Sequence, residues 1–470
     1  MTDLATSLSQ LLGPKGWLSG EDAAPYRRDW LDRCGEQPLG VARPASTQEV
    51  AQVVALCAGA NVPVVPQGGN TGLCCAGVVT GGGGVILSLS RMARIGEPDL
   101  ASGSVEVEAG AVLETLHESL APHGLIFPLH LGSEGSARIG GLIGTNAGGS
   151  HALRYGMMQD LVLGLEVVLA DGTIWDGMRA VQKDNAGYQL RKLFCGAEGT
   201  LGVVTRAILK LHPAPRQRAT ALLTGPSLAA IVEFGVRVRA EAGEFISGLE
   251  FFADTGLSFV LDHLDVGAFP LQTRGEAHLL IELGSTSSLV PLDDILMALL
   301  EQGLEDGLIL DGTLAATNAQ RAHFWRLREE LPEGQRLEGA QLKNDISVPP
   351  GRVADYVDAA RALCEELLPG VRINPFGHLG DGNIHFNLSP PPSADGFGGR
   401  DGEIASALAA LATRMHGSFA AEHGLGRTKI KLADSHRGPV ERQLMATIKR
   451  ALDPDGVLNP GVIVAGPGKE

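Results

Sequence analysis

The chain has 470 residues, of which 44% are hydrophobic and 20% charged, a balance typical of globular proteins with two or three domains. Its formal net charge of -16 disfavours nucleic acid and anionic membrane surfaces as partners. No apolar stretch is long and unbroken enough to span a bilayer, and the first residues lack a secretion leader, so we expect a cytoplasmic protein.

Cysteine usage agrees with that expectation. The chain has no CxxC pair and no regular cysteine spacing. This pattern predicts a buried, reduced set of thiols in a cytoplasmic protein. The set is Cys34, Cys57, Cys74, Cys75, Cys195 and Cys364.

The first part of the chain has a mixed α/β pattern. Ser46–Ala60 reads as a capped helix, because a Ser or Thr precedes apolar residues at helical spacing. The segment 62–72 reads as a buried strand that runs into a glycine loop. Val85–Leu89 and Ser104–Ala109 read as further strands, and Val112–His123 as a helix that ends before a glycine.

The next segments suggest where the first domain ends. Residues 132–149 are nearly all small, and no packed helix or strand accounts well for that composition. Residues 161–175 read as a β-hairpin turning at Asp-Gly, and Thr200–Leu211 as a strand followed by prolines. Beyond them, helices and strands alternate with fewer glycines. We expect a long helix over 404–423 and another over 440–452.

Three glycine-rich segments suit an anionic ligand. They are PQGGNTG (66–72), the run 132–149 and GAEGTLG (196–202). Without side chains, several backbone amides can converge on phosphate oxygens. Two such loops in one domain favour a long ligand with two phosphates. Because no GxGxxG follows a strand and no GxxxxGKS or GxxxxGKT occurs, a flavin in a different fold is a better fit than NAD.

These segments carry a family resemblance. PQGGNTG, GTNAGG, RYG, LGLEVVLADG and GAEGTLG stand in the order found in FAD-binding proteins of the vanillyl-alcohol oxidase type. Over residues 40–463 the chain resembles the D-2-hydroxyglutarate and D-lactate dehydrogenases. Since residues 64–80 contain no histidine, the resemblance implies non-covalent FAD. The residues it implies for FAD binding are Pro66, Gly68, Gly69, Asn70, Thr71, Gly72, Gly132, Ser136, Gly141, Thr145, Asn146, Gly149, Glu198, Gly199, Val204 and Asn459.

A second group of residues suits a metal ion. His378 and His385 flank the turn LGDGN, which can fold both imidazoles toward one point, and Glu422 follows in AEHG at the end of the expected helix. Two imidazoles and a carboxylate form an open catalytic metal site. The resemblance implies that His378, His385 and Glu422 are the ligands. Zn²⁺ is the expected ion, and Mn²⁺ or Fe²⁺ suits the same donors.

His423 stands next to one of these ligands. A hydroxyl bound to a metal loses its proton more easily, and a neutral imidazole can take that proton near neutral pH. We therefore expect His423 to be both the catalytic base and a substrate contact. The alternative is that His423 is a fourth ligand or only supports the ligands.

An acidic protein that acts on an anion needs nearby cations. WRLREELPEG and QLKNDISVPP supply Arg328 and Lys343. The resemblance implies that both contact the substrate carboxylates and that Asn387 is a further polar contact. Pro332 departs from the family pattern, which has a Thr there, so one hydrogen bond to a distal carboxylate is lost or is made elsewhere. D-malate and D-lactate therefore gain weight as substrates beside D-2-hydroxyglutarate.

Together these features predict an α+β protein of the vanillyl-alcohol oxidase type. We expect a two-subdomain FAD domain over 1–213, an antiparallel-sheet substrate and metal domain over 214–435, and a helical segment over 436–470 that returns to the FAD domain. The expected reaction is oxidation of a D-2-hydroxy acid, with D-2-hydroxyglutarate as the best candidate.

Several alternatives stay open from the sequence. The chain could be a D-lactate dehydrogenase, a flavin-binding protein without catalysis, or an oxidase of a different alcohol such as a phenol or sugar. The resemblance suggests an electron-transfer flavoprotein or a quinone as electron acceptor, and a homodimer.

Overall fold

The computed structural model describes residues 2–466. Contacts divide the chain into two compact units. Unit 1 comprises Met1–Gly149, Tyr155–Pro213 and Glu422–Glu470, and unit 2 comprises Ser150–Arg154 and Ala214–Ala421. In the described residues, no helix is both long and apolar enough to cross a membrane.

Unit 1 begins with a small mixed sheet. Its strand order is β1 (Trp17–Leu18), β2 (Gly40–Ala42), β4 (Val85–Ser88) and β3 (Val64–Gln67), with β2, β4 and β3 parallel. Helices α1 (Thr2–Gly16) and α2 (Thr47–Gly59) pack against each other beside it. The Ser46 hydroxyl accepts the amide of Glu49 and caps α2, as the sequence predicts.

The second sheet of unit 1 is antiparallel, in the order β5 (Ser104–Glu108), β9 (Val203–Lys210), β7 (Val162–Val168) and β8 (Ile174–Gly177). Every residue of β7 is buried, and one hydrophobic core joins both sheets of the unit. The two α/β subdomains that the sequence predicts are therefore present, and helix α3 (Leu113–Leu120) buries its apolar side chains in the same core.

The small-residue run 132–149 contains a helix, α4 (Ile139–Thr145), although its composition indicated none. Ile139, Leu142 and Ile143 recur at helical spacing and are buried. Gly140 lets this face approach closely, because a Cβ there would lie 2.8 Å from the Cβ of Ala109. The tertiary contact with β5 thus overrides the weak helix propensity of glycine.

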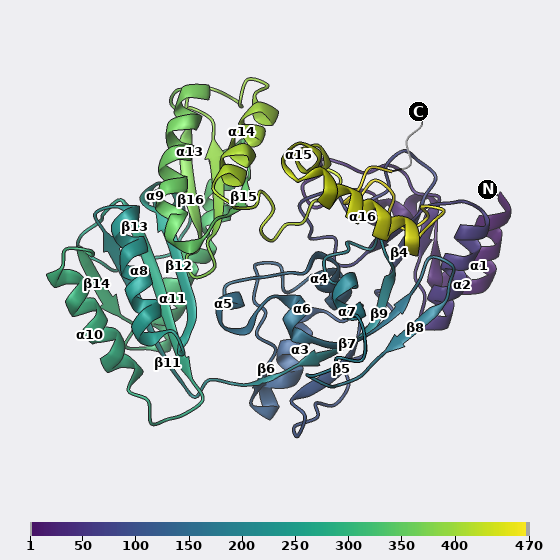
Figure 1. Ribbon diagram of the computed structural model, residues 1–470, viewed down its shortest axis with the longest axis horizontal. Helices are drawn as coiled ribbons and strands as arrows, with labels where there is room; N and C mark the ends of the chain where they lie inside the picture. The colour runs from purple at the N-terminus through teal and green to yellow at the C-terminus, as the bar shows by residue number, and fades with distance from the viewer. Residues whose placement is uncertain (1, 467–470) are drawn as a thin grey trace. The chain divides into compact units, whose positions relative to one another are not determined.

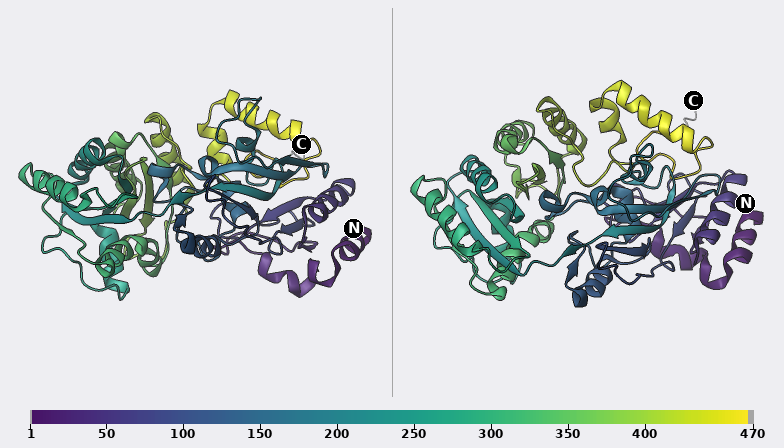
Figure 2. Two further views of the ribbon diagram at one scale, coloured as in Figure 1. Left: turned by 90° about the horizontal axis from the view of Figure 1, so that it is seen from below. Right: turned by 60° about the horizontal axis from the view of Figure 1, so that its bottom comes forward.

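Unit 2 is built on a 7-stranded antiparallel sheet with helices on both faces (Figures 1 and 2). Helices α8 (Leu228–Ala242), α10 (Leu292–Glu305), α13 (Val353–Leu367) and α14 (Asp401–Arg414) form one layer. Helices α9 (Asp254–His263), α11 (Asn318–Glu329) and α12 (Leu331–Leu337) form the other. The strand order is β14 (Asp311–Leu314), β11 (Gln217–Gly225), β13 (Ala277–Ser285), β12 (Ile246–Ala253), β16 (Arg372–His378), β17 (Asn383–Ser389) and β15 (Asp345–Ser347).

The helix expected over 404–423 is shorter than predicted. Helix α14 ends at Arg414, and His416 takes a left-handed φ of 59° just beyond it. The amide of Ser418 then donates to the Ser347 carbonyl (2.7 Å), so the chain pairs with β15 instead of continuing as helix. The prediction that Glu422 and His423 stand at a helix end is therefore wrong, because both lie in a loop.

The C-terminal segment belongs to unit 1. After α15 (Ile430–His436) and α16 (Pro439–Leu452), Leu458 forms a parallel bridge with Val64 of β3. The return to unit 1 begins at Glu422, whereas the sequence placed the boundary at 435. It begins there because the amides of Leu425 and Gly426 both donate to the buried Glu198 carboxylate.

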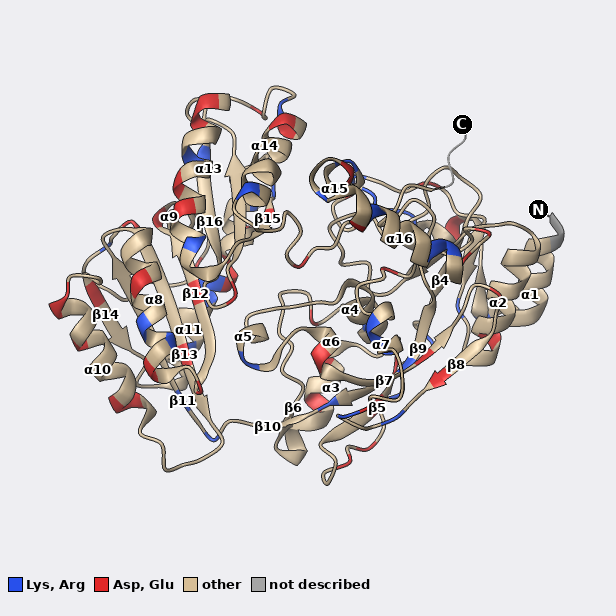
Figure 3. Ribbon diagram, viewed as in Figure 1, with Lys and Arg blue, Asp and Glu red and all other residues tan. Residues whose placement is uncertain are grey.

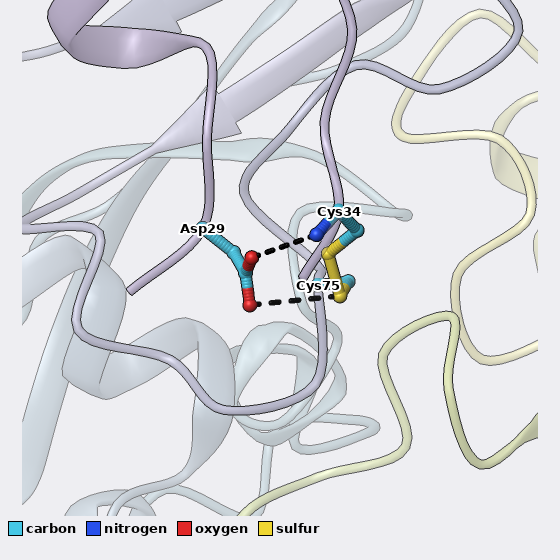
Figure 4. A group of neighbouring side chains, drawn as sticks. All are labelled: Asp29, Cys34 and Cys75. Carbon is cyan, nitrogen blue, oxygen red and sulfur yellow. Dashed lines mark hydrogen bonds between the residues drawn. A yellow bond between two sulfur atoms is a disulfide. The ribbon is translucent and has the colours of Figure 1, made fainter. Parts of the chain in front are cut away.

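Two cysteines form a disulfide, contrary to the predicted reduced set (Figure 4). Cys34 and Cys75 are 41 residues apart in sequence, and their Cα atoms lie 6.2 Å apart, within the usual range for a disulfide. Asp29 accepts the Cys34 amide at 2.9 Å and lies 3.7 Å from the Cys75 sulfur. Spacing could not reveal the pair, because only the folding of the N-terminal segment onto the loop after β3 brings it together.

Candidate active site

The first two glycine loops meet directly in unit 1. A Cβ on Gly68 would lie 3.2 Å from the Cα of Gly141, and one on Gly69 would lie 2.0 Å from the Ser136 carbonyl oxygen. No residue with a side chain fits at Gly69 without displacing the facing backbone. The loop after β3 and the segment leading into α4 are therefore in contact through their main chains.

The third loop joins the same place. Gly199 has a φ of 71°, and a Cβ there would lie 2.9 Å from the Pro66 ring. The amide of Glu198 donates to the Gly144 carbonyl (2.7 Å). The side-chain amide of Asn459 donates to the Glu198 carbonyl (2.7 Å), which fastens the C-terminal segment 458–461 to this loop. Three segments far apart in sequence thus form one backbone-lined region.

This region fits a phosphate-bearing cofactor. At Gly68 and Gly69 the first two loops touch backbone to backbone, and among the described residues no atom outside the adjoining chain lies within 4 Å of a Cβ built on Gly72 or Gly132. Backbone-lined loops of this kind suit anionic oxygens. All residues that the sequence predicts for FAD binding lie in unit 1.

Some of these residues use their side chains to hold the loops. Asn70 donates to the Arg28 carbonyl, and Asn146, with a left-handed φ of 50°, accepts the Gln159 amide. Glu198 is buried, and its burial raises the pKa of the carboxyl to about 7 despite the amides that face it. These side chains shape the region as well as lining it.

Unit 2 brings two of the predicted metal ligands together. His378 ends β16 and His385 lies in β17, and their ring centroids are 5.6 Å apart. The turn between them needs glycine, because Gly382 has a φ of 81° and a Cβ there would lie 1.9 Å from the Val348 carbonyl oxygen. The turn thus places both imidazoles on one face of the hairpin.

Glu250 is a residue that the sequence reasoning missed. It lies on β12, is 1% exposed, and accepts a hydrogen bond from His378 Nδ1 (2.7 Å). Its other oxygen pairs with Arg328 Nη2 (2.9 Å). Burial raises the pKa of Glu250, but the facing imidazole and guanidinium outweigh it and hold the pKa below its usual value. A glutamate inside an otherwise apolar strand, GLEFF, was the signal that could have identified it.

Arg328 is buried and held on two sides. Beyond the ion pair with Glu250, its guanidinium carbon lies 4.9 Å from the centroid of the Phe376 ring. Its Nε atom is shielded from solvent and has no hydrogen-bond partner among residues 2–466. The predicted substrate cation is thus rigidly placed and retains one donor that protein atoms leave unused.

The other predicted substrate contacts lie on neighbouring strands of unit 2. Asn387 of β17 is buried opposite Asn374 of β16, and Lys343 lies two residues before the start of β15. Pro332 stands in the first turn of α12, where its missing amide donor costs no helix bond. Figure 3 marks acidic residues on the outer helices α10 and α13, and Arg328 is the only buried Lys or Arg among the described residues.

Glu422 and His423 lie in unit 1, whereas His378 and His385 lie in unit 2. Glu422 Oε1 accepts the amide of Gly149 (2.9 Å) at the end of the second glycine loop. A Cβ on Gly148 would lie 2.6 Å from the same oxygen, so that glycine leaves room for the carboxylate. The candidate carboxylate ligand is therefore fixed to the predicted flavin region.

Two family models match the chain. The model described as FAD linked oxidases, C-terminal domain, matches residues 214–463, and the model described as FAD binding domain matches residues 38–177. Together they cover parts of both units.

Curated relatives match nearly the whole chain. A mitochondrial D-2-hydroxyglutarate dehydrogenase of Bos taurus is 38% identical over 94% of this chain and 79% of that protein. The corresponding protein of Arabidopsis thaliana is 36% identical over 96% of this chain and 79% of its own length. A D-2-hydroxyglutarate dehydrogenase of Stutzerimonas stutzeri is 33% identical over 99% of this chain and 100% of its own length.

Solved structures share the fold at lower identity. An alkyldihydroxyacetonephosphate synthase aligns with a TM-score of 0.74 at 16% identity, covering 98% of this chain and 84% of its own. A p-cresol methylhydroxylase aligns with a TM-score of 0.74 at 20% identity, covering 98% of this chain and 96% of its own. These likenesses confirm the predicted vanillyl-alcohol oxidase type of fold.

Proposed function

The chain belongs to the D-2-hydroxyglutarate dehydrogenase family of FAD-linked oxidases, and from this we propose that it oxidises a small D-2-hydroxy acid to the 2-oxo acid. As a member it is an FAD-dependent dehydrogenase acting on a CH–OH donor. The observation that carries the proposal is the buried array in which Glu250 holds both Arg328 and His378. One carboxylate thereby orients a cation for the substrate and a candidate metal ligand.

FAD, when bound, supplies the acceptor for the hydride from the substrate C2, which carries both electrons of the oxidation. The three glycine loops of unit 1 would hold it through backbone amides, with Asn146 and Asn459 keeping those loops in place. Non-covalent attachment stays a prediction, supported by the lack of a histidine in residues 64–80.

His378, His385 and Glu422 would hold a divalent metal ion. His378 donates from Nδ1 to Glu250, so the lone pair of Nε2 points away from Glu250 and can coordinate a metal ion. This is the usual arrangement of metal-binding histidines. A two-imidazole, one-carboxylate donor set suits Zn²⁺, Mn²⁺ or Fe²⁺, and we propose Zn²⁺. Such an ion, when bound, makes the substrate hydroxyl more acidic.

The remaining steps fall to side chains of this chain. Arg328 and Lys343 would bind substrate carboxylate oxygens, with Asn387 as a further polar contact. His423 would take the hydroxyl proton on its imidazole as the hydride leaves C2. Because Pro332 offers no hydroxyl to a distal carboxylate, D-malate stands beside D-2-hydroxyglutarate as the proposed substrate, and D-lactate is the second candidate.

The electron acceptor is proposed to be an electron-transfer flavoprotein or a quinone. A homodimer and a cytoplasmic location stay predictions from the sequence.

The buried Arg328–Glu250–His378 array argues against a flavin-binding protein without catalysis. A merely structural protein has no need to bury a guanidinium donor that it leaves unused.

An anaerobic screen tests the proposal. The purified protein is mixed with pairs of D- and L-2-hydroxy acids, and the flavin absorbance is followed. The D-acids should bleach the flavin and the L-acids should not, and NAD added together with a D-acid should not be reduced. Equal bleaching by both enantiomers, or none by any 2-hydroxy acid, would overturn the proposal.

A further inference from the structure

A second cluster of metal-ligating side chains lies in unit 1, apart from the residues considered so far. His117 stands on α3, and His130 and Glu134 stand in the loop that leads toward α4. We propose that His117, His130 and Glu134 bind a divalent transition-metal ion, of the Zn²⁺ class, that fastens the second glycine loop to α3.

The distances match the spacing of ligands around one ion. Oε2 of Glu134 lies 3.0 Å from Nδ1 of His117 and 3.3 Å from Nδ1 of His130, and all three ligand atoms lie within 4.8 Å of one another. Bonds of about 2.0–2.1 Å in a tetrahedral zinc site separate neighbouring ligand atoms by about 3.3 Å. The three atoms are thus arranged around a common point.

The hydrogen bonds around the cluster leave the right atoms for a metal. His117 Nε2 lies 3.1 Å from the Phe127 carbonyl oxygen, to which it can only donate, so the Nδ1 atom of a neutral ring carries the lone pair. Glu134 Oε2 is shielded from solvent and lies close to Nδ1 of both His117 and His130. A carboxylate oxygen that faces two imidazole nitrogens is an arrangement that a shared cation stabilises.

The side chains of His117, His130 and Glu134 are 19%, 40% and 35% exposed, so solvent can reach the cluster and a water molecule can complete the coordination.

The backbone holds the cluster in place. The amide of Leu113 donates to the Ala137 carbonyl, and that of Glu114 donates to the Glu134 carbonyl, tying the start of α3 to the loop. Gly149 packs so closely on His130 that a Cβ would lie 2.3 Å from its carbonyl oxygen. An ion here would stiffen a loop whose residues Gly132 and Ser136 are proposed to bind FAD, so the inference rests in part on that proposal.

Without a metal, the same geometry would be an imidazolium–carboxylate ion pair. A measurement of zinc binding distinguishes the metal site from the ion pair. The FAD-loaded protein is stripped with a chelator, re-equilibrated with Zn²⁺, freed of loose ion by gel filtration and analysed for bound metal. In the His378→Ala/His385→Ala background, which removes two ligands of the proposed catalytic ion, one equivalent of zinc should remain. Adding Glu134→Gln should abolish it, and adding His123→Asn on the exposed residue nearby should not.

The outcomes distinguish this inference from the proposed function. Loss of all zinc in the His378→Ala/His385→Ala protein, or its retention after Glu134→Gln, would overturn the second site and leave the catalytic metal untouched. If the wild-type protein binds one ion and only the Glu134→Gln change removes it, the second site is supported and the proposed catalytic metal is contradicted.

A further measurement tests the effect on the loop. Zn²⁺ should slow FAD release from the wild-type protein several-fold and leave release from the His130→Asn variant unchanged. An equal effect of zinc on both proteins, or no effect on either, would overturn the role in fastening the loop.

Discussion

Nδ1 of His378 lies 2.7 Å from Oε1 of Glu250, a carboxylate that is almost fully buried and that also pairs with Arg328. Glu250 therefore connects the proposed metal ligand to the proposed substrate cation. In many metalloproteins a carboxylate in this position orients the ligand ring and raises its basicity.

Replacing Glu250 tests that role. Glu250→Gln should lower zinc affinity and kcat/KM by about 10–100-fold, the usual loss when such a partner is removed. Equilibrium zinc titration and steady-state kinetics measure both. Glu282→Gln is the matched control, because Glu282 is equally buried on the adjacent strand β13 but accepts from Trp325, Ser247 and Thr220 instead of histidine or arginine. Similar losses in both variants would point to general destabilisation.

The roles of the metal and of His423 can be separated. A chelator should abolish turnover while the FAD is still bound, and zinc should restore it. His423→Asn should keep the catalytic metal but lower turnover by about 10²–10⁴-fold, the usual contribution of a positioned base. Its residual rate should also lose the dependence on a group that titrates near neutral pH.

Metal analysis provides the check on His423. His378→Ala should lose the catalytic ion and the activity together, whereas His423→Asn should lose activity alone. An empty metal site in His423→Asn would identify the histidine as a ligand, and the proton acceptor would have to be another group.

The contact between the first two glycine loops predicts a cofactor defect. Gly69→Ala would place a methyl group 2.0 Å from the Ser136 carbonyl oxygen and must push the loops apart. The purified variant should retain several-fold less FAD per chain, measured from its flavin absorbance. Gly59→Ala, at the end of α2 with no atom within 4 Å of the added Cβ, should keep the wild-type flavin content. Full FAD occupancy in Gly69→Ala would show that the loop contact is dispensable.

The raised pKa of Glu198 predicts that the stability of the protein depends on pH. Burial raises the pKa of its carboxyl from 4.5 to about 7 in the folded state. Between these values the folded chain keeps a proton that the unfolded chain has lost, so the free energy of unfolding falls as pH rises from about 4.5 to about 7. The fall attributable to this group is about 3 kcal/mol.

Denaturant unfolding at several pH values compares wild type with Glu198→Gln. The difference in unfolding free energy between the two proteins should shift by about 3 kcal/mol across this window in favour of the variant, because an amide has no proton to lose. The exposed Glu241→Gln should track the wild type. Parallel curves for wild type and Glu198→Gln would contradict the raised pKa.

Local patterns in the sequence were enough for most elements and for the family. The Ser46 cap predicted α2, and alternating apolar residues around Asp171–Gly172 predicted the β7–β8 hairpin. The glycine motifs predicted the flavin fold. These features depend on residues within one or two turns of each other, so their physical causes are present in short stretches of the chain.

Features that join distant residues appeared only in the folded chain. His378 and Glu250 are 128 residues apart, and Cys34 and Cys75 are 41 residues apart. Helix α14 stops at Arg414 because Ser418 pairs with Ser347 of β15. The periodicity of apolar residues along the helix does not indicate this pairing. Burial, ion pairing and strand pairing are set by which segments the topology brings side by side, and a single sequence carries no local sign of that choice.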